Sequence, residues 1–464
     1  MNKDLKFIIA GGKTGGHLFP GIAVAQAISR IEPSSHILFV GTGESFEIQT
    51  VARYGFEHKS ITSMAIKGKS ITRKLAALLH IPLSILQAMT IMKKYRPDMV
   101  LGVGGYASGP VLACAKMMGI PTAIHEQNSI AGITNKTLSY IVDTIFTSFD
   151  PTRGLDGARV MDGCKKIIHT GNPMRNGAGS AAPAQNVSES AATAQNGAES
   201  ATPAQNQTEF ATSARKRAGH KPSALDEDGI IASRQESIPL TVLVTGGSQG
   251  ARSINTAVIE AVRKILDKVI EHGEETGEKK DQGKNHYGHG EHRNNPEIHC
   301  HIIHQTGALD ENRVLNAYSE LKNPKSLTNG YDAGCPVKVT ASAFFHEMPQ
   351  IMARADLIIC RAGAGTISEI TALGKPSLLV PYPHAADDHQ TFNARILADK
   401  GAAWMVCDSE LTGEYVVEKI SFAANHPDYM KNMAVNSGKL GLPHADRAIA
   451  HSCINTARQA LKAN

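Results

Sequence analysis

Three glycine-rich segments are the first candidates for chemistry in this sequence. They are AGGKTGGHLFP at residues 10–20, TGGSQGARSIN at 245–255 and CRAGAGTISEI at 360–370. Each follows an apolar run that is typical of a buried strand and precedes a stretch with helical spacing. Backbone N–H groups at the start of a helix attract anions, and glycine lets a ligand approach the backbone closely. The three turns therefore predict a nucleotide-linked ligand with a diphosphate group.

Side chains beside these turns suggest more specific roles. His17 follows the first turn and ionises near neutral pH, so it could transfer a proton or could simply satisfy the start of a helix. Glu369 stands early in the helix after the third turn, where it could accept hydrogen bonds from both hydroxyls of a ribose. Alternatively, Glu369 is only a charge that the helix dipole favours. The segments GGYASGP (104–110) and HEQNSIAG (125–132) place further polar residues at the same sheet edge.

The sequence argues against several other kinds of site. It has no GxxxxGK[ST] segment, so a P-loop is not expected. The first turn does not match GxGxxG, and no acidic residue ends the strand HILFVGTG, which disfavours a dehydrogenase. A metal site is not expected either, because the polar segment around the histidines offers no ordered support for ligands. These histidines are His286, His289, His292, His299, His301 and His304.

Apolar runs and helical stretches alternate along two parts of the chain. The first part contains KFIIA, HILFVG, DMVLGVGG, PTAIHEQ and TIFTSF, which are typical of parallel strands covered on both faces. Helical stretches are expected between them at 18–31, 44–54, 70–95, 108–119 and 131–141. The alternation resumes at PLTVLVTGG, with helices expected at 252–271 and 308–322. The pattern predicts an α/β protein with two doubly wound, Rossmann-like domains that face a cleft.

Two polar segments interrupt this pattern. The first contains a ten-residue repeat with almost no large apolar residues, so we expect a disordered insertion. We therefore divide the chain into an N-terminal domain (1–175), the low-complexity insertion (176–237), a C-terminal domain (238–440) with a polar insertion at 272–297, and a helical tail (441–464).

Composition limits the class of protein. With 464 residues, 42% of them hydrophobic, the chain can form two domains with real cores. The net charge of +5 is too small to predict nucleic acid as a partner. Residues 1–100 contain 13 Lys and Arg against 6 Asp and Glu, which suits either an anionic surface or an ordinary solvated face. The seven cysteines show no CxxC spacing, so we expect a reducing, cytosolic compartment.

The segment LAALLHIPLSILQAMTIM (75–92) is nearly long enough to span a bilayer. Polar residues and a proline interrupt it, so we expect a helix of the fold. Leu75, Leu78, Leu79 and Leu83 share one side at helical spacing, and this side could face either the core or lipid. Basic residues flank the helix, namely Lys67, Lys69, Arg73, Lys74, Lys93, Lys94 and Arg96.

Seven segments in order resemble the motifs of the MurG family. They are GGKTGGHLFPGIAVA, VLGVGGYASGP, IHEQNSIAGITNK, TGNPMR, VTGGSQGARSIN, CRAGAGTISEI and PYPHAADDHQTFNA. The resemblance covers both expected domains and skips both insertions. It implies the GT-B glycosyltransferase fold and the transfer of N-acetylglucosamine from UDP-N-acetylglucosamine to lipid I. The product, lipid II, serves bacterial peptidoglycan synthesis.

The resemblance assigns individual positions. The family's usual GGTGGH appears here as GGKTGGH, with Lys13 as an extra residue. On the acceptor side the matching residues are His17, Tyr106, His125 and Glu126. On the donor side the resemblance places Ser248 near the diphosphate, Phe345 by its main chain at the uracil, and residues 364–369 at the diphosphate and ribose. The complete donor set is Thr14, Gly15, Gly16, Asn128, Arg175, Ser248, Phe345, Ala364, Gly365, Thr366, Ile367, Ser368, Glu369 and Gln390.

The expected reaction is attack of the muramyl 4-hydroxyl on the anomeric carbon, with inversion and departure of UDP. His17 is the expected base, supported by Glu126, and backbone N–H groups would stabilise the diphosphate. No acidic DxD pair stands near the sugar, so we expect no metal and no cofactor. The expected partners are UDP-N-acetylglucosamine, lipid I and an anionic membrane surface at the cytoplasmic face of the inner membrane, where the protein would be peripheral. A UDP-N-acetylglucosamine 2-epimerase and a non-catalytic nucleotide-sugar sensor remain alternatives.

Overall fold

The computed structural model describes residues 3–12, 14–63, 71–155, 166–174, 239–247, 250–278, 299–321 and 337–463. Residues 71–81, 166 and 268–278 are described by their backbone alone. Both sheets belong to one compact unit, Met1–Pro183 with Pro239–Asn464. The expected insertion at 176–237 lies outside the described residues.

The N-terminal sheet has seven parallel strands in the order β3-β2-β1-β4-β5-β6-β7. The order reverses between β1 and β4, as expected for a doubly wound sheet. Its strands are β1 (Lys6–Ala10), β2 (His36–Gly41), β3 (Glu57–Ser60), β4 (Met99–Gly102), β5 (Thr122–Glu126), β6 (Thr144–Thr147) and β7 (Lys166–His169). Its helices are α1 (Gly15–Ile31), α2 (Ser45–Arg53), α3 (Ile71–Tyr95), α4 (Ser108–Met117) and α5 (Ile133–Leu138).

The C-terminal sheet has six parallel strands in the order β10-β9-β8-β11-β12-β13. Its strands are β8 (Leu240–Thr245), β9 (Cys300–Gln305), β10 (Val337–Ser342), β11 (Leu357–Cys360), β12 (Ser377–Leu379) and β13 (Trp404–Met405). The helices in this part are α7 (Arg252–Glu278), α8 (Glu311–Ser319), α10 (Met348–Arg354), α11 (Ala364–Ala372), α12 (His389–Ala398), α13 (Gly413–Asn425), α14 (Pro427–Lys439) and α15 (Ala445–Ala463), with 3-10 turns η2 (Ala386–Asp388) and η3 (Asp408–Glu410).

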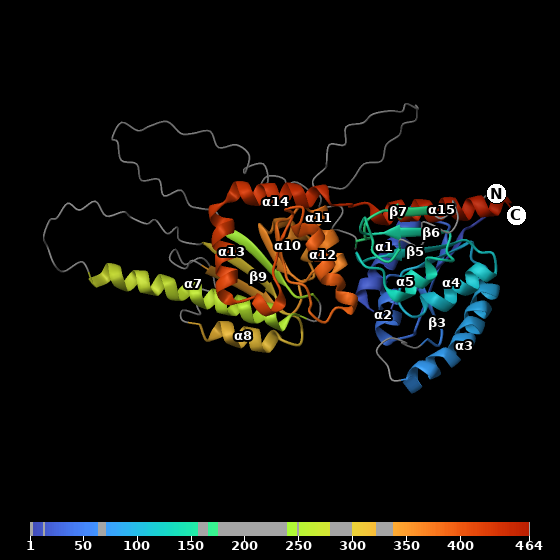
Figure 1. The fold of residues 1–464 in the computed structure, drawn as a ribbon, viewed down its shortest axis with the longest axis horizontal. Helices are drawn as coiled ribbons and strands as arrows, with labels where there is room; N and C mark the ends of the chain where they lie inside the picture. Colours follow the sequence, from blue (N-terminus) through green and yellow to red (C-terminus); the bar gives the residue numbers. More distant parts are fainter. Residues whose placement is uncertain are drawn as a thin grey trace, which may run out of the picture. The chain divides into compact units, whose positions relative to one another are not determined.

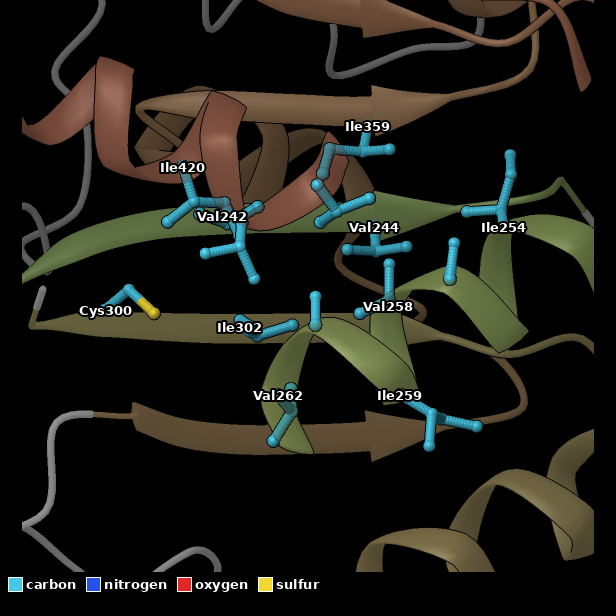
Figure 2. Packing of buried hydrophobic residues seen from close by; sticks show 14 of the residues in the cluster. Val242, Val244, Ile254, Val258, Ile259, Val262, Cys300, Ile302, Ile359 and Ile420 are labelled. Carbon is cyan, nitrogen blue, oxygen red and sulfur yellow. The ribbon is translucent and has the colours of Figure 1, made fainter. Parts of the chain in front are cut away.

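Each sheet is covered on both faces, because successive side chains of a strand point to opposite sides. In β1, Phe7 and Ile9 join one apolar cluster, whereas Ile8 joins another. In β8, Val242 and Val244 pack with residues of α7, including Val258 (Figure 2), whereas Leu243 belongs to the cluster on the other face. Complete burial of one such side chain contributes about 1.5–3 kcal/mol. This two-sided burial explains why the strands are continuous apolar runs.

The C-terminal helix α15 completes the core of the N-terminal domain. Ile449, Cys453 and Ile454 of α15 are buried in the same cluster as Phe7 and Ile9. The helix runs beside α1 (Figure 1). Ion pairs join the two helices' ends, Arg30 with Asp446 and Arg458 with Glu32. The expected helical tail is therefore part of the N-terminal core.

The α/β fold with two Rossmann-like sheets is confirmed, and three details differ from the prediction. Strands β3 and β7 were not expected from the sequence. The helix expected at 252–271 continues to Glu278, into the segment that was expected to be a polar insertion. Helix α3 is a helix of the fold as predicted, and no helix in the described part of the chain is long and apolar enough to cross a membrane.

Candidate active site

The first glycine turn meets two other polar segments at the carboxyl edge of the N-terminal sheet. Strands β1, β4 and β5 are neighbours, so the residues that follow them lie side by side. Gly11 has φ +124°, and a Cβ atom there would lie 2.0 Å from the carbonyl oxygen of Gly104. The hydroxyl of Ser108 donates to the carbonyl oxygens of Ala10 (2.8 Å) and Gly104 (2.9 Å). These contacts fix the first turn against the segment 104–110.

His17 is linked to the end of β5 by a glutamine. The Nδ1 atom of His17 lies 2.9 Å from Oε1 of Gln127. The Nε2 atom of Gln127 lies 3.1 Å from Nδ1 of His125 and donates to the carbonyl oxygen of Val103 at 2.9 Å. The other ring nitrogen of His125 lies 3.2 Å from the carbonyl oxygen of Gly171. Burial lowers the pKa of His125 to about 4, so its ring is neutral at pH 7.

The carboxylate of Glu126 is surrounded by hydrogen-bond donors from its own loop. Its Oε1 accepts from the backbone N–H of Asn128 (3.0 Å), and its Oε2 accepts from Gly132 N–H (3.0 Å) and from Asn135 Nδ2 (2.9 Å). Glu126 is buried. The structure thus gives this side chain an anchoring role in the HEQN segment, while the contact with His17 comes from Gln127.

Asn128 and Ser129 contact a residue of α12. The backbone N–H and the hydroxyl of Ser129 donate to Oδ1 of Asn393 at 2.9 and 2.7 Å. Nδ2 of Asn393 donates to Oδ1 of Asn128 and to the carbonyl oxygen of Ala362, both at 3.3 Å. Asn393 is fully buried. It therefore joins the HEQN segment to the third glycine turn.

The third turn forms the N-terminus of α11. Gly363 is the N-cap of α11 with extended backbone (φ −68°, ψ 142°). Cβ atoms at Gly363 and Gly365 would meet open space, so a ligand can approach the backbone here. Thr366, Ser368 and Glu369 of α11 are half-buried, whereas Ala364 and Ile367 are buried. The Ser368 hydroxyl donates to the carbonyl oxygen of Ala364 (2.9 Å).

The other expected site residues that the structure describes differ in exposure and in hydrogen bonding. Thr14 is the exposed N-cap of α1, Gly16 is exposed, and Gly15 and Tyr106 are half-buried. The backbone N–H of Phe345 donates to Oε1 of Gln305 (3.2 Å), and Oε1 of Gln390 accepts from Tyr382 N–H (3.0 Å). Lys13, Arg175 and Ser248 lie outside the described residues.

Four residues of these networks were not singled out in the sequence: Gln127, Gln305, Arg361 and Asn393. Arg361 donates to the carboxylate of Asp408 and to the hydroxyl of Ser253 (2.9 Å), which connects the third turn to the start of α7. Gln305 donates to the hydroxyl of Thr245 (3.2 Å), just before the second turn. Gln127, Arg361 and Asn393 lie inside motifs quoted from the sequence, so for these three only the individual role was missed. Gln305 lies outside those motifs.

One histidine of β9, His304, contributes hydrogen bonds to the interior of the C-terminal part. His304 is buried, with ring nitrogens 2.8 Å from the hydroxyl of Tyr318 and 3.0 Å from Oδ1 of Asn255. Burial lowers its pKa to about 4. His286, His289 and His292 lie outside the described residues. Among the residues that are described, no group of three or more His, Cys, Asp or Glu side chains is arranged to hold a metal ion.

Comparison with known proteins identifies the class. The model of the glycosyltransferase family 28 N-terminal domain matches residues 7–147, and that of the C-terminal domain of the same family matches residues 241–449. Together these matches cover most of the chain, including nearly all strands of both sheets. The chain therefore contains both domains of a family 28 glycosyltransferase.

Individual relatives narrow this class. A UDP-N-acetylglucosamine–N-acetylmuramyl-(pentapeptide) pyrophosphoryl-undecaprenol N-acetylglucosamine transferase from Myxococcus xanthus is 34% identical over 451 residues, 97% of this chain and 93% of its own. The protein of the same name from Syntrophus aciditrophicus is 35% identical, covering 97% of this chain and 98% of its own. The crystal structure of Acinetobacter baumannii MurG is similar with a TM-score of 0.66 and 25% identity, covering 97% and 99% of the two chains. The chain belongs to the MurG family.

A UDP-N-acetylglucosamine 2-epimerase from Neisseria meningitidis is also similar in structure. Its TM-score is 0.55 with 11% identity, covering 97% of this chain and all of that one. This likeness concerns the fold alone.

Proposed function

We propose that this protein transfers N-acetylglucosamine from UDP-N-acetylglucosamine to the 4-hydroxyl of the muramyl sugar of lipid I, forming lipid II with inversion at the anomeric carbon. The main support is sequence similarity: over nearly its full length, the chain is 34% and 35% identical to transferases that are named for this reaction. The site supports it, because a histidine and an open helix N-terminus occur at the carboxyl edges of the two sheets. Lipid II supply in turn would support cell-wall growth, cell shape and cell division.

The N-terminal turn is proposed to bind the acceptor and to remove its proton. Nε2 of His17 accepts the proton of the 4-hydroxyl as the oxygen attacks the anomeric carbon. The bond from that carbon to the diphosphate oxygen breaks, and UDP leaves with the electron pair. Tyr106 and His125 lie on the acceptor side, and Thr14, Gly15, Gly16 and Asn128 face the sugar. Glu126 contributes by fixing the loop that carries Asn128.

The C-terminal turns are proposed to bind the donor. The N-terminus of α11 receives the diphosphate, where backbone N–H groups and the helix dipole stabilise the negative charge that develops on UDP. Glu369 accepts hydrogen bonds from the ribose hydroxyls. The main chain at Phe345 contacts the uracil, Ser248 lies near the diphosphate, and Arg175 and Gln390 complete the donor contacts. The reaction requires no cofactor in this scheme.

Product analysis tests the proposed function. The protein would be incubated with UDP-N-acetylglucosamine labelled in the sugar, with and without a soluble lipid I analogue. We expect the label to enter the lipid only when the analogue is present. Formation of labelled N-acetylmannosamine without acceptor would instead identify an epimerase, and binding of UDP-N-acetylglucosamine without any turnover would identify a sensor.

We further propose that the protein binds peripherally to anionic lipid at the cytoplasmic face of the cell membrane. Along α3, Ser84, Ala88 and Met92 are buried, whereas Leu83 and Leu86 are 44% and 59% exposed. The spacing of the buried residues defines the inner side of the helix, so these leucines lie on its outer side. Lys93 and Lys94 follow on the same helix and are exposed. Apolar burial and attraction to acidic headgroups would act together here.

The membrane proposal is tested by sedimentation with vesicles containing phosphatidylglycerol. Replacing both Leu83 and Leu86 with Ser is expected to reduce the bound fraction and to leave UDP binding unchanged. Met117, which is 72% exposed on α4, provides a matched Met117→Ser control. Equal partitioning of the double variant and the parent would exclude this side of α3 as the membrane contact. The residues Lys67, Lys69, Arg73, Lys74, Leu75, Leu78 and Leu79 await the same test, since their side chains lie outside the described part.

A further inference from the structure

The side-chain amide of Gln127 occupies a central place beside the proposed base. It is 2% exposed and stands directly after β5. Its oxygen lies 2.9 Å from Nδ1 of His17, and its nitrogen contacts Val103 O (2.9 Å), His125 O (3.2 Å) and His125 Nδ1 (3.1 Å). A single neutral group therefore connects α1, β4 and β5 at the point where the three elements meet.

The surroundings determine which way this amide points. The carbonyl oxygens of Val103 and His125 can only accept hydrogen bonds, so the NH₂ group of Gln127 must face them. Turning the amide over would bring its oxygen against two carbonyl oxygens inside the protein and take the donor away from Val103 O, which is costly. The amide oxygen consequently faces His17.

The orientation of the amide determines the position of the proton on His17. An amide oxygen only accepts, so Nδ1 of His17 must carry a hydrogen. A neutral imidazole has one N–H group, so the proton on Nδ1 leaves a lone pair on Nε2. Neutral histidine in water favours the opposite tautomer, with the proton on Nε2. The protein thus selects the form in which Nε2 can accept a proton.

The same chain of contacts accounts for His125. Its Nδ1 accepts from Gln127, so its proton is on Nε2, where the carbonyl oxygen of Gly171 accepts at 3.2 Å. The hydroxyl of Ser148 lies 3.2 Å from the same nitrogen and donates to the carbonyl of Glu126 at 3.0 Å, which leaves its oxygen free to accept. Because His125 O also accepts from Nδ2 of Asn135 at 3.1 Å, the two amide hydrogens of Gln127 can serve Val103 O and His125 Nδ1, and one set of tautomers fits these contacts. The lowered pKa of His125, about 4 through burial, agrees with a neutral ring that accepts at Nδ1.

We propose that Gln127 is a positioning residue that holds His17 in its Nδ1–H tautomer and so presents an unprotonated Nε2 to the acceptor hydroxyl. The catalytic role of this tautomer rests on the proposed function, whereas the tautomer itself is a property of the protein without substrate. In the reaction, Nε2 takes the hydroxyl proton while the new glycosidic bond forms and UDP leaves. After the transfer, the imidazolium of His17 still donates its Nδ1–H to the oxygen of Gln127. Because the amide carries no charge, Gln127 does not stabilise the imidazolium as a carboxylate would.

Histidine-selective ¹⁵N labelling tests the tautomer without any substrate. Two-bond proton–nitrogen correlation spectra distinguish a protonated from an unprotonated ring nitrogen, and a His17→Gln variant assigns the signals. At a pH where His17 is neutral, we expect Nδ1 of His17 to be protonated in the parent. In Gln127→Met, which keeps the length of the side chain but removes its hydrogen bonds, we expect the Nε2–H tautomer to dominate. An unprotonated Nδ1 in the parent, or an unchanged spectrum in Gln127→Met, would overturn the proposal.

Two further variants separate the tautomer from packing. Gln127→Glu keeps an acceptor for His17 but loses the N–H donors to Val103 and His125, so we expect Nδ1–H of His17 to persist. Gln87→Met, in α3, removes an acceptor that binds Thr62 N–H at 2.7 Å and serves as a control for loss of a glutamine hydrogen bond in the same domain. Loss of the Nδ1–H signal of His17 in Gln127→Glu or in the control would count against the assignment.

Measurements of kcat then test whether Gln127 matters for catalysis. With a soluble lipid I analogue, Gln127→Met is expected to lower kcat by about 10- to 10³-fold, as a wrong tautomer or a lost general base does, with the KM for UDP-N-acetylglucosamine nearly unchanged. Normal kcat in a variant that has lost Nδ1–H would overturn the catalytic role and leave the proposed function intact. Absence of transfer in the parent would overturn the proposed function and leave the tautomer result standing.

Discussion

The first and third glycine turns look alike in sequence but are built differently. Around the first turn, side chains are packed closely: a Cβ on Gly104 would lie 2.8 Å from Nδ1 of His17. Around the third turn, Gly363 and Gly365 border open space, and the backbone at the N-terminus of α11 is the accessible feature. The glycines around the first turn leave space for neighbouring protein atoms, whereas Gly363 and Gly365 of the third turn border open space.

This contrast suggests a division of labour. Proton transfer depends on the orientation of one imidazole ring, which a network of buried side chains can fix. Stabilising a leaving diphosphate depends on backbone N–H groups with space in front of them. The predictions below test whether the two turns really have these separate functions.

Removing His17 should have the largest effect. In His17→Ala we expect kcat to fall by about 10²–10⁴-fold, because a positioned general base is lost. UDP affinity, measured by calorimetry, should hardly change, since the residues proposed to bind the diphosphate, the ribose and the uracil belong to the other sheet. A variant with full turnover at saturating substrates would contradict the acceptor-side role of the first turn.

Acid should destabilise both halves, because each contains a buried neutral histidine with a pKa of about 4, namely His125 and His304. In the unfolded chain these histidines take up protons near pH 6.5, whereas in the folded protein they do so only near pH 4. The free energy of unfolding is therefore at its full value above pH 6.5 and decreases as the pH falls towards 4. Each shift corresponds to roughly 3 kcal/mol. Thermal unfolding measured from pH 7 to pH 4.5 should show the loss.

Replacing His304 sharpens the acid experiment. His304→Gln removes the group that titrates in the C-terminal half, so its stability, although lower at pH 7, should depend less on pH between 6.5 and 4. A parent and a variant with the same pH dependence would contradict the assignment of this effect to His304.

Glu369→Ala should weaken UDP binding by about 10- to 100-fold, because charge-assisted hydrogen bonds to the ribose contribute roughly 1.5–3 kcal/mol. The tautomer of His17 should remain as in the parent, which separates the two turns. Glu414, whose side chain is 85% exposed on α13, offers a Glu414→Ala control with the same loss of charge. Calorimetry that gives the same UDP affinity for Glu369→Ala and the parent would remove Glu369 from the donor site.

A pair of glycine variants tests the comparison most directly. Gly104→Ala places a methyl group against His17 at a residue with φ +91°, so we expect a loss of about 1–2 kcal/mol of stability together with reduced turnover. Gly363→Ala meets neither strain nor a neighbour, so its stability should change by less than about 0.5 kcal/mol while UDP binding weakens. The opposite pattern, strain at Gly363 and none at Gly104, would reverse the interpretation of the two turns.

Sequence reasoning predicted the strands that are buried on both faces, because their apolar runs are a direct consequence of that burial. It missed β3, which is Glu-His-Lys-Ser and mostly exposed, since an edge strand needs no apolar run. It also missed β7, Lys-Ile-Ile-His, which is the other edge strand of this sheet. Helix α7 continues through polar residues past its expected end, because a helix that leaves the core no longer needs apolar spacing.

Site residues could be predicted from the sequence where the residue type alone suggests the role. They could not be predicted where the role depends on contacts with residues far away in the sequence. His17 stands out as a histidine beside a glycine turn. Gln127 does not, because its role comes from contacts with residues 110 and 24 positions away in sequence. Asn393 likewise acquires its role through Ser129, 264 positions away. Such contacts are set by the order of strands and helices, which apolar spacing alone does not specify.

Helix α15 has a consequence for how the protein is made. The N-terminal sheet ends at His169, but the helix that completes its core begins at Ala445. At roughly 5–20 residues per second, the ribosome needs on the order of tens of seconds to synthesise the intervening chain. During this interval the newly made N-terminal half carries an apolar surface that its own final segment has yet to cover. A nascent chain halted before Ala445 should therefore bind chaperones that recognise exposed apolar surface, and a released chain that includes α15 should not.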